Sequence, residues 1–487
     1  MKALWRERLG AVRVKTPDRA MDVLLNGWLM YQTWSARVLG RTGYYQCGGA
    51  VGFRDQLQDM LSILHSDPAR VRAHILLCAS RQFEAGDVLH WWHPPVNGVR
   101  TRITDDRLFL PYVALAYAES TGDASIWEEN APYLEDMPIL EGKRDLYCAM
   151  REGKIAEPLY LHCARAVERT LEMGAHGLPL MGGGDWNDGM DHVGDGGGES
   201  VWLGMLLLHV LTRFAPLARQ RGDAERAARY DAEAARLRAA LEEAGWDGAW
   251  YRRAYFGDGR SLGARGGEAC AIDLIAQAWA AMCGLPHAEE AFDSAMALLS
   301  DRENGVVRLL APPFERPDPA VGYISSYLPG VRENGGQYTH AAAWLLRAAC
   351  LLNKPDKARE LFSMLSPIAH GDSPFAMRRY KAEPYVLAGD VYAVGRNAGR
   401  GGWTWYTGAA GWLYEVTLSD LLGVTRRGDR LFLTPCTDFP EYSVWLRFGK
   451  TAYEITVRGG ARGPEEGIPL VDDGLHHSLL FEPPQPT

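Results

Sequence analysis

The sequence contains no long apolar run, no CxxC pair and no excess of basic residues, and each absence excludes a class of protein. Its best candidate for a membrane span, residues 201–211, is shorter than the roughly 20 residues that crossing a bilayer requires, and it contains His209. The opening MKALWRERLG lacks the apolar core of a signal peptide. Eight cysteines without a CxxC pair are typical of reduced thiols, so we expect a cytoplasmic protein. The formal charge of −9 argues against a nucleic acid or an anionic membrane as partner.

The composition is that of a large globular protein. The chain has 487 residues, of which 47% are hydrophobic and 23% charged, and it is long enough for a sizeable core. It also has 16 tryptophans. Aromatic rings line sugar-binding clefts and also fill large cores, so their number leaves both interpretations open. The acidic net charge is compatible with a small anion held by a local arginine cluster.

Helical periodicity dominates from about residue 17 to residue 422. Some segments begin with capping signals, such as the pair Asp67-Pro68. The predicted helices are 18–38, 67–83, 105–120, 158–173, 199–220, 224–244, 269–282, 287–299, 337–352, 355–365 and 403–422. We therefore predict one helical domain over residues 17–422 and assign residues 1–16 to a linker or a truncated edge.

Five connections between these helices are long and rich in glycine, proline, tryptophan and charge: 41–52, 86–104, 174–198, 305–336 and 372–402. Long loops inside a compact domain are usually functional. Their recurrence between helical hairpins predicts a ring of helix pairs with the loops gathered on one face. A solenoid of helix pairs would give a similar pattern, although the sequence has no repeat of fixed period.

The sequence pattern changes after residue 422. DRLFLTP, YSVWLRFGKTAYEITVRGG and HHSLLFEPP alternate apolar and polar residues and are rich in β-branched and aromatic side chains. We expect residues 423–487 to form a small β-rich unit that packs against the helical domain.

A glycine-rich loop, GGGDWNDGMDHVG at 182–194, contains Asp185, Asp188 and Asp191. Because glycine disfavours regular structure, this segment is predicted to be a loop. Such a loop is a solvated surface, a calcium site or a source of acid–base groups. The spacing of its aspartates lacks the EF-hand pattern with its closing glutamate, and nothing else in the sequence requires a metal.

A second cluster, GFRDQLQD, places Arg54 and Asp55 at the start of a predicted helix, with Asp59 one turn later. Acidic residues at a helix start complement the helix dipole, which is the structural interpretation. The functional interpretation is a sugar clamp, because carboxylates and a guanidinium group form directed hydrogen bonds with hydroxyls. Glu383 and Tyr385 in AEPYV are further candidates for contact with a sugar.

Two more motifs contain groups that suit an anion. RENGGQYTHAA places His340 at a helix start, and GGWTWYTGAAGW offers the hydroxyl of Thr407 and the backbone of Gly408. Helix starts with such donors suit phosphate, while an isolated histidine is also common as a structural residue.

GFRDQLQD, GGGDWNDGM, ENGGQYTHAA and GWTWYTGAAGWLY occur in this order, and together they resemble the inverting glycoside phosphorylases that include cellobiose and chitobiose phosphorylase. The chain especially resembles the C-terminal phosphorylase-like domain of cyclic β-1,2-glucan synthases. The resemblance covers nearly the whole chain. It implies a mainly α fold, an (α/α)6 toroid of helical hairpins with its catalytic cleft on the loop face and a small C-terminal β-unit.

The resemblance also implies roles for individual residues. The aspartate of the Trp-Asn-Asp triplet is the family's general acid, which falls on Asp188. The family's phosphate site falls on His340, Thr407 and Gly408. The family's donor-sugar subsite falls on Arg54, Asp55, Asp59, Asp185 and Trp186. Beside the resemblance, Asn187, Glu383 and Tyr385 are further residues that we expect to bind the sugar.

The sequence departs from the family's pattern in two ways. Synthase-type domains more often have Asn-Arg after Gly-Met, where this chain has Asp191-His192, which would change the charge near the acid. The N-terminal β-sandwich of the stand-alone phosphorylases and the membrane-bound transferase of the synthases have no counterpart in this sequence. The sequence leaves open whether the chain forms a homodimer or is part of a larger synthase.

One acid together with an anion site favours phosphorolysis over hydrolysis. An inverting hydrolase needs a second carboxylate to activate water, whereas phosphate is already a nucleophile. We expect inversion at a β-glucoside, β-1,2-linked by the resemblance, with phosphate as co-substrate and no cofactor. Protonation of Asp188 near neutral pH would require burial or nearby negative charge to raise its pKa. An inverting hydrolase and a non-catalytic glucan-binding fragment are the alternatives.

Overall fold

The computed structural model describes residues 2–43 and 47–483, and its helices account for most of the regular structure. Short π-helical turns extend some of them, such as Thr33–Leu39 after α3 and Thr417–Leu421 after α15. The helices are α1 (Lys2–Leu9), α2 (Arg19–Val23), α3 (Leu29–Gln32), α4 (Phe53–Ser62), α5 (Pro68–Ala79), α6 (Phe109–Thr121), α7 (Leu159–Thr170), α8 (Val201–Gln220), α9 (Ala224–Ala240), α10 (Leu274–Met282), α11 (Ala288–Leu299), α12 (Thr339–Leu351), α13 (Pro355–Leu365), α14 (Pro374–Tyr380) and α15 (Ala409–Val416).

Local sequence signals explain where several of these helices begin. The Asp67 side chain accepts a hydrogen bond from the backbone N–H of Arg70, and Pro68 occupies the first turn of α5. The Ser200 hydroxyl caps α8 in the same way by accepting from the backbone N–H of Leu203. Each of the predicted helical segments contains a helix, most often one to six residues shorter at its ends.

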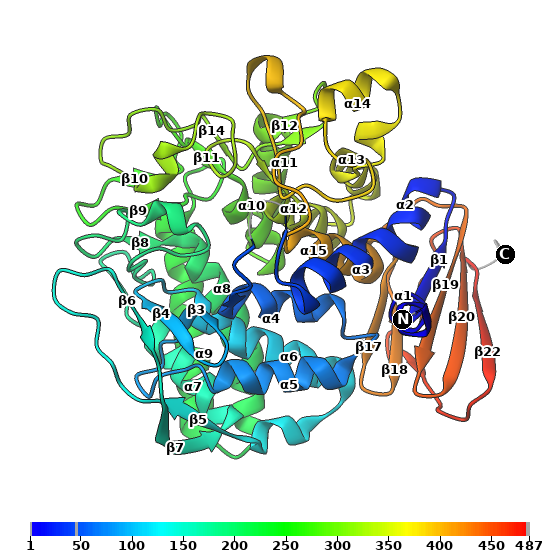
Figure 1. The fold of residues 1–487 in the computed structure, drawn as a ribbon, viewed down its shortest axis with the longest axis horizontal. Helices are drawn as coiled ribbons and strands as arrows, with labels where there is room; N and C mark the ends of the chain where they lie inside the picture. Colours follow the sequence, from blue (N-terminus) through cyan, green and yellow to red (C-terminus); the bar gives the residue numbers. More distant parts are fainter. Residues whose placement is uncertain (1, 44–46, 484–487) are drawn as a thin grey trace.

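Six helices contact one another in a closed series. α4 packs against α6, α6 against α8, α8 against α10, α10 against α12, α12 against α15, and α15 returns to α4. A second helix lies beside each of these six, namely α3 beside α15, α5 beside α4 and α6, α7 beside α6 and α8, α9 beside α8, α11 beside α10 and α13 beside α12. The structure is therefore mainly helical, as the sequence predicts (Figure 1).

Tryptophans fill the space between the six helices. Trp344 of α12 lies with its ring centroid 6.1 Å from that of Trp202 on α8, 5.3 Å from that of Trp279 on α10 and 5.6 Å from that of Trp412 on α15. All four side chains are buried. Large aromatic side chains bury 150–250 Å² each, so this cluster makes a large contribution to the core.

Among residues 2–43 and 47–483, one helix, α8, is long and apolar enough to cross a membrane, but 72% of its apolar window is buried inside the protein. α8 contacts α6, α7, α9 and α10. It is therefore a core helix of this fold.

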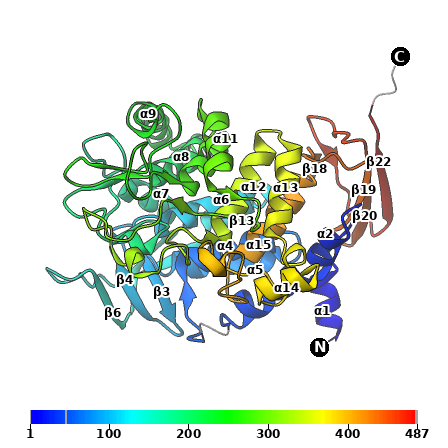
Figure 2. The ribbon, with the colours of Figure 1, turned by 90° about the horizontal axis from the view of Figure 1, so that it is seen from above.

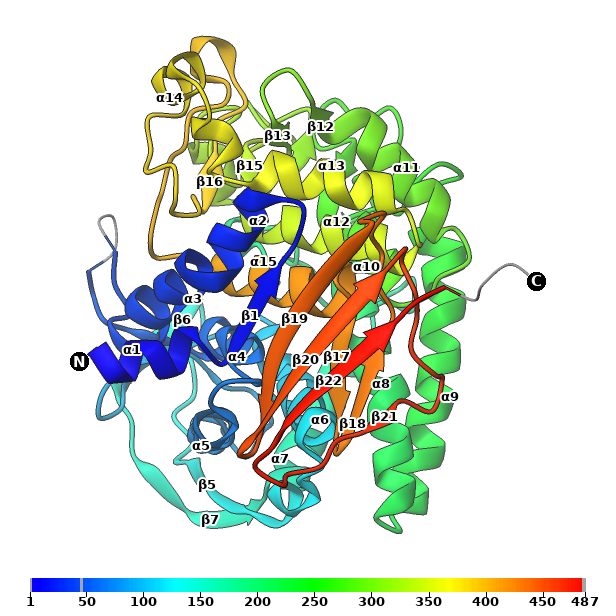
Figure 3. The ribbon, with the colours of Figure 1, turned by 90° about the vertical axis from the view of Figure 1, so that its right-hand side faces the viewer.

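The C-terminal segment forms strands, as predicted. β17 (Val424–Arg427), β18 (Arg430–Leu433) and β21 (Ile468–Pro469) make one sheet, in which β17 contacts α6. A four-stranded sheet in the order β1-β19-β20-β22 lies across one end of the helical domain (Figure 3); it contains β19 (Glu441–Phe448), β20 (Thr451–Arg458) and β22 (His476–Phe481).

The structure corrects the expectation of a linker at residues 1–16. This segment forms α1 and then β1 (Val12–Lys15), which pairs antiparallel with β19 and places Val12 opposite Leu446. Val12 and Val14 are buried while Arg13 and Lys15 are exposed, the alternation of a strand with one face on the core. The N-terminal segment therefore completes the C-terminal sheet.

Four of the five long connections, 41–52, 86–104, 305–336 and 372–402, also contain short strands. A four-stranded sheet joins β2 (Val51–Gly52), β3 (Leu89–His93), β4 (Asn97–Thr101) and β6 (Asp145–Ala149), and it lies on the same side of the helical body as α14 (Figure 2). The remaining strands are β5 (Asn130–Leu134), β7 (Glu152–Pro158), β8 (Glu199–Ser200), β9 (Ala254–Tyr255), β10 (Ser261–Leu262), β11 (Ile272–Asp273), β12 (Ser300–Asp301), β13 (Val306–Val307), β14 (Leu310–Ala311), β15 (Gln337–Tyr338) and β16 (Asp390–Val391).

Candidate active site

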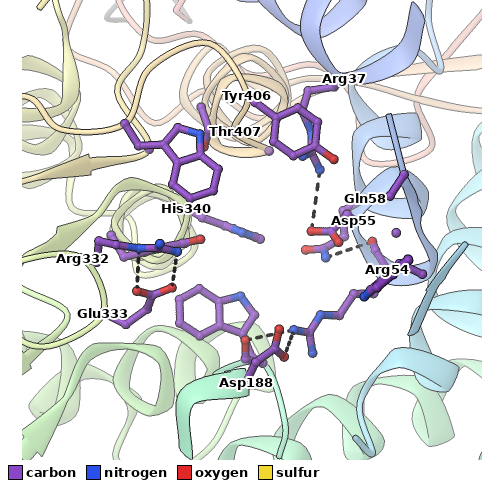
Figure 4. A pocket seen from close by; sticks show the side chains of 18 of the residues that line it. Arg37, Arg54, Asp55, Gln58, Asp188, Arg332, Glu333, His340, Tyr406 and Thr407 are labelled. Carbon is purple, nitrogen blue, oxygen red and sulfur yellow. Dashed lines mark hydrogen bonds and ion pairs between the residues drawn. The ribbon is translucent and has the colours of Figure 1, made fainter. Parts of the chain in front are cut away.

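A pocket of about 390 Å³ collects residues from all five long connections and from the beginnings of three helices (Figure 4). The helices are α4, α12 and α15, which contribute Arg54, His340 and Gly408 respectively, the last as the residue capping α15. Helix N-termini carry partial positive charge, so this arrangement favours an anion in the pocket. Its volume is in the range of pockets that bind small ligands.

Asp188 lines the pocket near the bottom of the view in Figure 4. The Asn187 side chain accepts a hydrogen bond from the backbone N–H of Gly189 and so caps the short helical turn that carries Asp188. One carboxylate oxygen accepts a hydrogen bond from Arg54, and the other lies 3.4 Å from Nε2 of His90. The acid that the sequence predicts is therefore in the pocket and paired with two cationic groups.

Arg54 connects Asp188 to two more carboxylates. Its guanidinium group also donates to Asp105, and its Nε lies 3.5 Å from Asp106. Asp105 and Asp106 precede α6 and are buried. A buried guanidinium group with several carboxylate partners stays charged, because each partner stabilises the cation.

The pKa of Asp188 in the chain without substrates is lowered, whereas the sequence analysis expected it to be raised. Burial favours the neutral acid, but the charges of Arg54 and His90 and their hydrogen bonds outweigh it, and they hold the pKa of Asp188 well below its usual range. Asp188 is therefore ionised before substrates bind. As a general acid it must gain its proton within the reaction cycle.

The loop that carries Asp188 is anchored by a buried ion pair. Arg253 donates to both carboxylate oxygens of Asp185 at 2.6 Å, and both side chains are fully buried. Asp185 also accepts from the hydroxyl of Ser200 at 2.6 Å. Asp273, also buried, lies 3.5 Å from Nε of Arg253. Asp185 thus positions the loop through these contacts and is not among the residues that line the pocket.

His340, Thr407 and Gly408 line the same pocket as Asp188. Burial, together with the nearby charges of Arg37 and Arg54, lowers the pKa of His340 to about 3, so its imidazole is neutral at physiological pH. Its Nε2 atom is buried and has no hydrogen-bond partner within the described residues. A neutral imidazole with an unpartnered nitrogen in a pocket is suited to binding a ligand oxygen.

Arg37 supplies the positive charge at this end of the pocket, and the sequence analysis missed it. Its Nε donates to Asp59 at 2.9 Å, and its guanidinium carbon lies 4.3 Å from the centre of the Tyr406 ring. A Cβ atom placed on Gly408 would lie 3.8 Å from a terminal nitrogen of Arg37, so this cation lies beside the start of α15. The neighbouring Asp55 carboxylate lies 3.7 Å from the same arginine.

Arg332 and Glu333 form a third wall of the pocket (Figure 4). Nε of Arg332 lies 3.2 Å from a carboxylate oxygen of Glu333. Burial raises the pKa of Glu333 although Arg332 opposes this shift. Tyr323, on the same long connection, also lines the pocket; its backbone N–H donates to the side chain of Asp191 at 3.1 Å.

The structure brings some of the predicted sugar-binding residues to the pocket and places others elsewhere. Arg54, Asp55 and Trp186 line the pocket. Those outside its lining have structural contacts instead: Asp59 with Arg37, Asp185 with Arg253, Asn187 with Gly189, Glu383 with the indole N–H of Trp405, and Tyr385 with the ring of Trp28.

Asp191 and His192 also lie outside the pocket lining. Arg144 donates to the backbone oxygen of Asp191 and, at 2.8 Å, to the side chain of Asp195. This departure from the family's pattern therefore lies on a partly exposed section of the loop, and Asp191 is linked to the pocket through the backbone N–H of Tyr323.

Two pocket residues that the sequence analysis missed, Arg37 and His90, lie outside the four motifs. Arg37 is a charged residue within the apolar segment TWSARVL, and His90 lies in the aromatic segment LHWWH. A charged or titratable residue within such a segment is the one available signal, because burying it requires a partner. The partners, Asp59 and Asp106, are 22 and 16 residues away.

The chain is similar in sequence to carbohydrate-active enzymes. Residues 4–423 match the model of the glycosyl hydrolase 94 superfamily, catalytic domain, and the chain belongs to this family. The resemblance read from the four motifs is thereby confirmed.

Relatives with assigned activities include a synthase and several phosphorylases. Cyclic β-(1,2)-glucan synthase NdvB of Rhizobium meliloti (strain 1021) is 45% identical over 478 residues, which are 96% of this chain and 17% of that protein. Solabiose phosphorylase of Paenibacillus borealis is 29% identical, and N,N'-diacetylchitobiose phosphorylase of Vibrio furnissii is 28% identical; each match covers 96% of this chain and 60% of the relative. The chain thus spans about a sixth of the synthase and 60% of the phosphorylases.

Solved structures share the fold at low identity. A GH78 family rhamnosidase of Bacillus sp. GL1 matches with a TM-score of 0.58 and 16% identity, over 97% of this chain and 44% of that one. A rhamnosidase from Klebsiella oxytoca with rhamnose bound matches with a TM-score of 0.52 and 14% identity, over 83% of this chain and 64% of that one. These neighbours are consistent with an (α/α)6-type fold.

Proposed function

We propose that this chain catalyses the reversible, inverting phosphorolysis of β-glucosides and releases α-glucose 1-phosphate. The observation that carries this proposal is that one pocket contains the carboxylate of Asp188 and a set of anion-binding groups. That set comprises His340, Thr407 and Gly408, with Arg37 beside Gly408.

The mechanism follows from these positions. Asp188 protonates the leaving oxygen while a phosphate oxygen attacks C1 from the opposite face of the sugar, which inverts the configuration. Arg37, the N-termini of α12 and α15 and the unpartnered nitrogen of His340 stabilise the phosphate and its charge. The glucosyl unit lies between the two ends of the pocket, where Trp186 and Arg54 also contribute to the lining.

Each of the other carboxylates that line the pocket contacts a cation or a backbone donor. Asp55 lies beside Arg37, Glu333 pairs with Arg332, and Asp390 accepts from the backbone N–H of Trp403 at 2.7 Å. An inverting hydrolase needs a free carboxylate that activates water on the face opposite the acid. These pairings support phosphate as the nucleophile.

β-1,2-Linked gluco-oligosaccharides are the substrates that we propose. This choice rests on the 45% identity with the relative named cyclic β-(1,2)-glucan synthase.

We further propose that the closed series of α4, α6, α8, α10, α12 and α15 is the inner ring of an (α/α)6 toroid, which their mutual contacts support. The eight cysteines are all free, which supports a cytoplasmic location. Association into a homodimer or within a larger synthase stays a prediction.

The synthetic direction tests the substrate. The chain is supplied with α-glucose 1-phosphate and each member of a panel of glucose disaccharides, and phosphate release is measured. We expect release with the β-1,2-linked acceptor to exceed that with β-1,3-, β-1,4- and β-1,6-linked acceptors. Release with another linkage alone would refute the assigned substrate, and binding of glucan without turnover in either direction would support a non-catalytic domain.

The phosphate site leads to a separate prediction. Replacing Thr407 with valine removes a hydroxyl but keeps the shape of the side chain, and we expect KM for phosphate to rise about tenfold to a hundredfold. A hydrogen bond to a charged group contributes about 1.5–3 kcal/mol. Initial rates at varied phosphate and saturating glucoside measure the effect. Thr417→Val, which removes a hydroxyl bonded to the backbone oxygen of Leu413 farther along the same helical segment, is the matched control. An unchanged KM for phosphate in T407V would place phosphate elsewhere.

A further inference from the structure

His90 lies between two carboxylates at the edge of the pocket. It belongs to β3, and its Nδ1 is 2.8 Å from a carboxylate oxygen of Asp106 while its Nε2 is 3.4 Å from Asp188. The side chain of Asp106 is 2% exposed and that of His90 is 15% exposed, so water competes little with their contact. Asp106 therefore fixes the ring so that its second nitrogen is directed at the predicted acid.

The charges around His90 favour the imidazolium form. Burial disfavours a charged ring, but Asp106 and Asp188 outweigh it and raise the pKa of His90 well above its usual value near 6.5. The opposing cation is Arg54, which contacts Asp105, Asp106 and Asp188 from α4. Tyr323 and Tyr327 also interact electrostatically with Asp188, and burial raises the pKa of both phenols, which are neutral. Asp105 interacts with Asp188 too, and burial raises the pKa of its carboxyl. In the free chain the proton is thus on His90 and Asp188 is a carboxylate.

We propose that His90 stores the proton that Asp188 delivers to the glycosidic oxygen, and that Asp106 positions His90 for this transfer. The inference rests on the proposed phosphorolysis and adds a third group to it. His90 acts through Asp188 and is therefore a positioning residue.

The proton transfer accompanies attack by a phosphate dianion. His90 Nε2 gives its proton to Asp188, and Asp188 passes a proton to the leaving oxygen as the bond from that oxygen to C1 breaks. A phosphate oxygen forms the new bond to C1. Neutral His90 keeps its Nδ1 proton in the hydrogen bond to Asp106, and Asp188 is again a carboxylate. His90 regains its proton from the acidic hydrogen of the glucose 1-phosphate product or from water after release.

Breaking of the glycosidic bond provides the reason for the first step. As the leaving oxygen separates from C1 it gains negative charge and proton affinity, and it draws the proton from His90 through Asp188. Asp188 therefore receives a proton only when both substrates are present. In the synthetic direction the same groups act in reverse, and Asp188 takes a proton from the acceptor hydroxyl.

The pH dependence of His90→Gln tests this proposal. Glutamine retains a polar group near Asp188 but holds no titratable proton. We expect kcat/KM for phosphorolysis to fall by about a hundredfold at pH 7.5 and by less than about tenfold at pH 5.5, where Asp188 obtains its proton more readily from solvent. The alkaline limb of the pH profile therefore moves to lower pH. An aryl β-glucoside whose leaving group departs as an anion needs no acid, and its cleavage is expected to change little.

His287→Gln is the matched control, because His287 also pairs with a carboxylate, that of Glu290, but on the exposed surface. Its profile should coincide with that of the wild type. An equal loss at both pH values in H90Q would identify a merely structural role and overturn the proposal.

Histidine NMR of the full chain separates this proposal from the proposed function. We expect the His90 ring to remain protonated at pH 7.5 in the wild type and to lose that proton in Asp106→Asn. A neutral ring in the wild type overturns the proton store even if phosphorolysis is observed. A protonated ring in a wild type that lacks phosphorolysis would instead overturn the proposed function and leave the charge arrangement intact.

Discussion

Replacing Asp188 with asparagine is expected to lower kcat for phosphorolysis by about 10²- to 10⁴-fold, the usual contribution of a general acid. Asparagine keeps the size of the side chain and an oxygen that can accept from Arg54, so the pocket should retain its shape. It has no acidic proton to give to a leaving oxygen. Initial rates of α-glucose 1-phosphate formation at saturating substrates measure the loss.

Asp195→Asn is the control for this variant because Asp195 lies on the same loop, is exposed and pairs with Arg144 outside the pocket. Its activity should match that of the wild type. An aryl glucoside with an acidic leaving group should restore much of the rate of D188N, because its departure needs no protonation. Near-normal kcat on an unactivated glucoside in D188N would refute the assignment of the acid.

Replacing Arg253 with methionine is expected to lower the free energy of unfolding by about 3–5 kcal/mol, because it leaves buried carboxylates without their cation. Arg253, Asp185 and Asp273 are all buried, and the arginine contacts both acids. Urea unfolding of the full chain, followed at pH 7.5, measures the change. Arg236→Met removes an exposed partner of Glu233 and should leave the free energy of unfolding nearly unchanged.

The effect of Arg253→Met should also depend on pH. Burial raises the pKa of Asp273 to about 6 in the wild type, although Arg253 opposes the shift. An acid whose folded pKa exceeds its unfolded value near 3.9 lowers stability as pH rises between the two values. In the wild type this loss ends near pH 6; without Arg253 the folded pKa is higher and the loss continues above pH 6. The stability difference between R253M and wild type should therefore widen from pH 6 to pH 8, and a constant difference would contradict this account.

Helical segments were predictable because their signals are local. Apolar spacing and caps such as Asp67-Pro68 lie within the segment that they specify. The segment VRVK was assigned to a linker because its pairing partner, β19, lies more than 400 residues away in the chain. The two-residue strands of the long connections were missed for a similar reason: they are too short to show an alternation, and distant residues determine their pairing.

The site was predictable where a motif carries the residue and its loop together. Asp188, His340 and Thr407-Gly408 come from separate motifs, and the structure brings them to one pocket. Arg37 and His90 were missed because only the folded chain brings them to Asp59 and Asp106. Asp185 and Asn187 were predicted to bind sugar because they lie close to Asp188 in the sequence. Their side chains instead stabilise the loop, Asp185 by its contact with Arg253 and Asn187 by its contact with Gly189.

The negative charge of Asp188 could not be predicted from the sequence, because it depends on partners that only the folded chain brings to this residue. The glycine-rich loop contains other acids, which suggested a raised pKa. The structure instead pairs Asp188 with Arg54, from a different helix, and with His90, from a different strand. Asp185, the nearest acid in sequence, is turned toward Arg253.

Real-time NMR of the reaction tests the central claim most directly. The chain is incubated with a β-1,2-linked gluco-oligosaccharide in the presence or absence of inorganic phosphate, and the first sugar product and its anomeric configuration are observed. The account predicts that α-glucose 1-phosphate forms only when phosphate is present. Release of free glucose at the same rate without phosphate, or formation of the β-anomer of the phosphate ester, would contradict it.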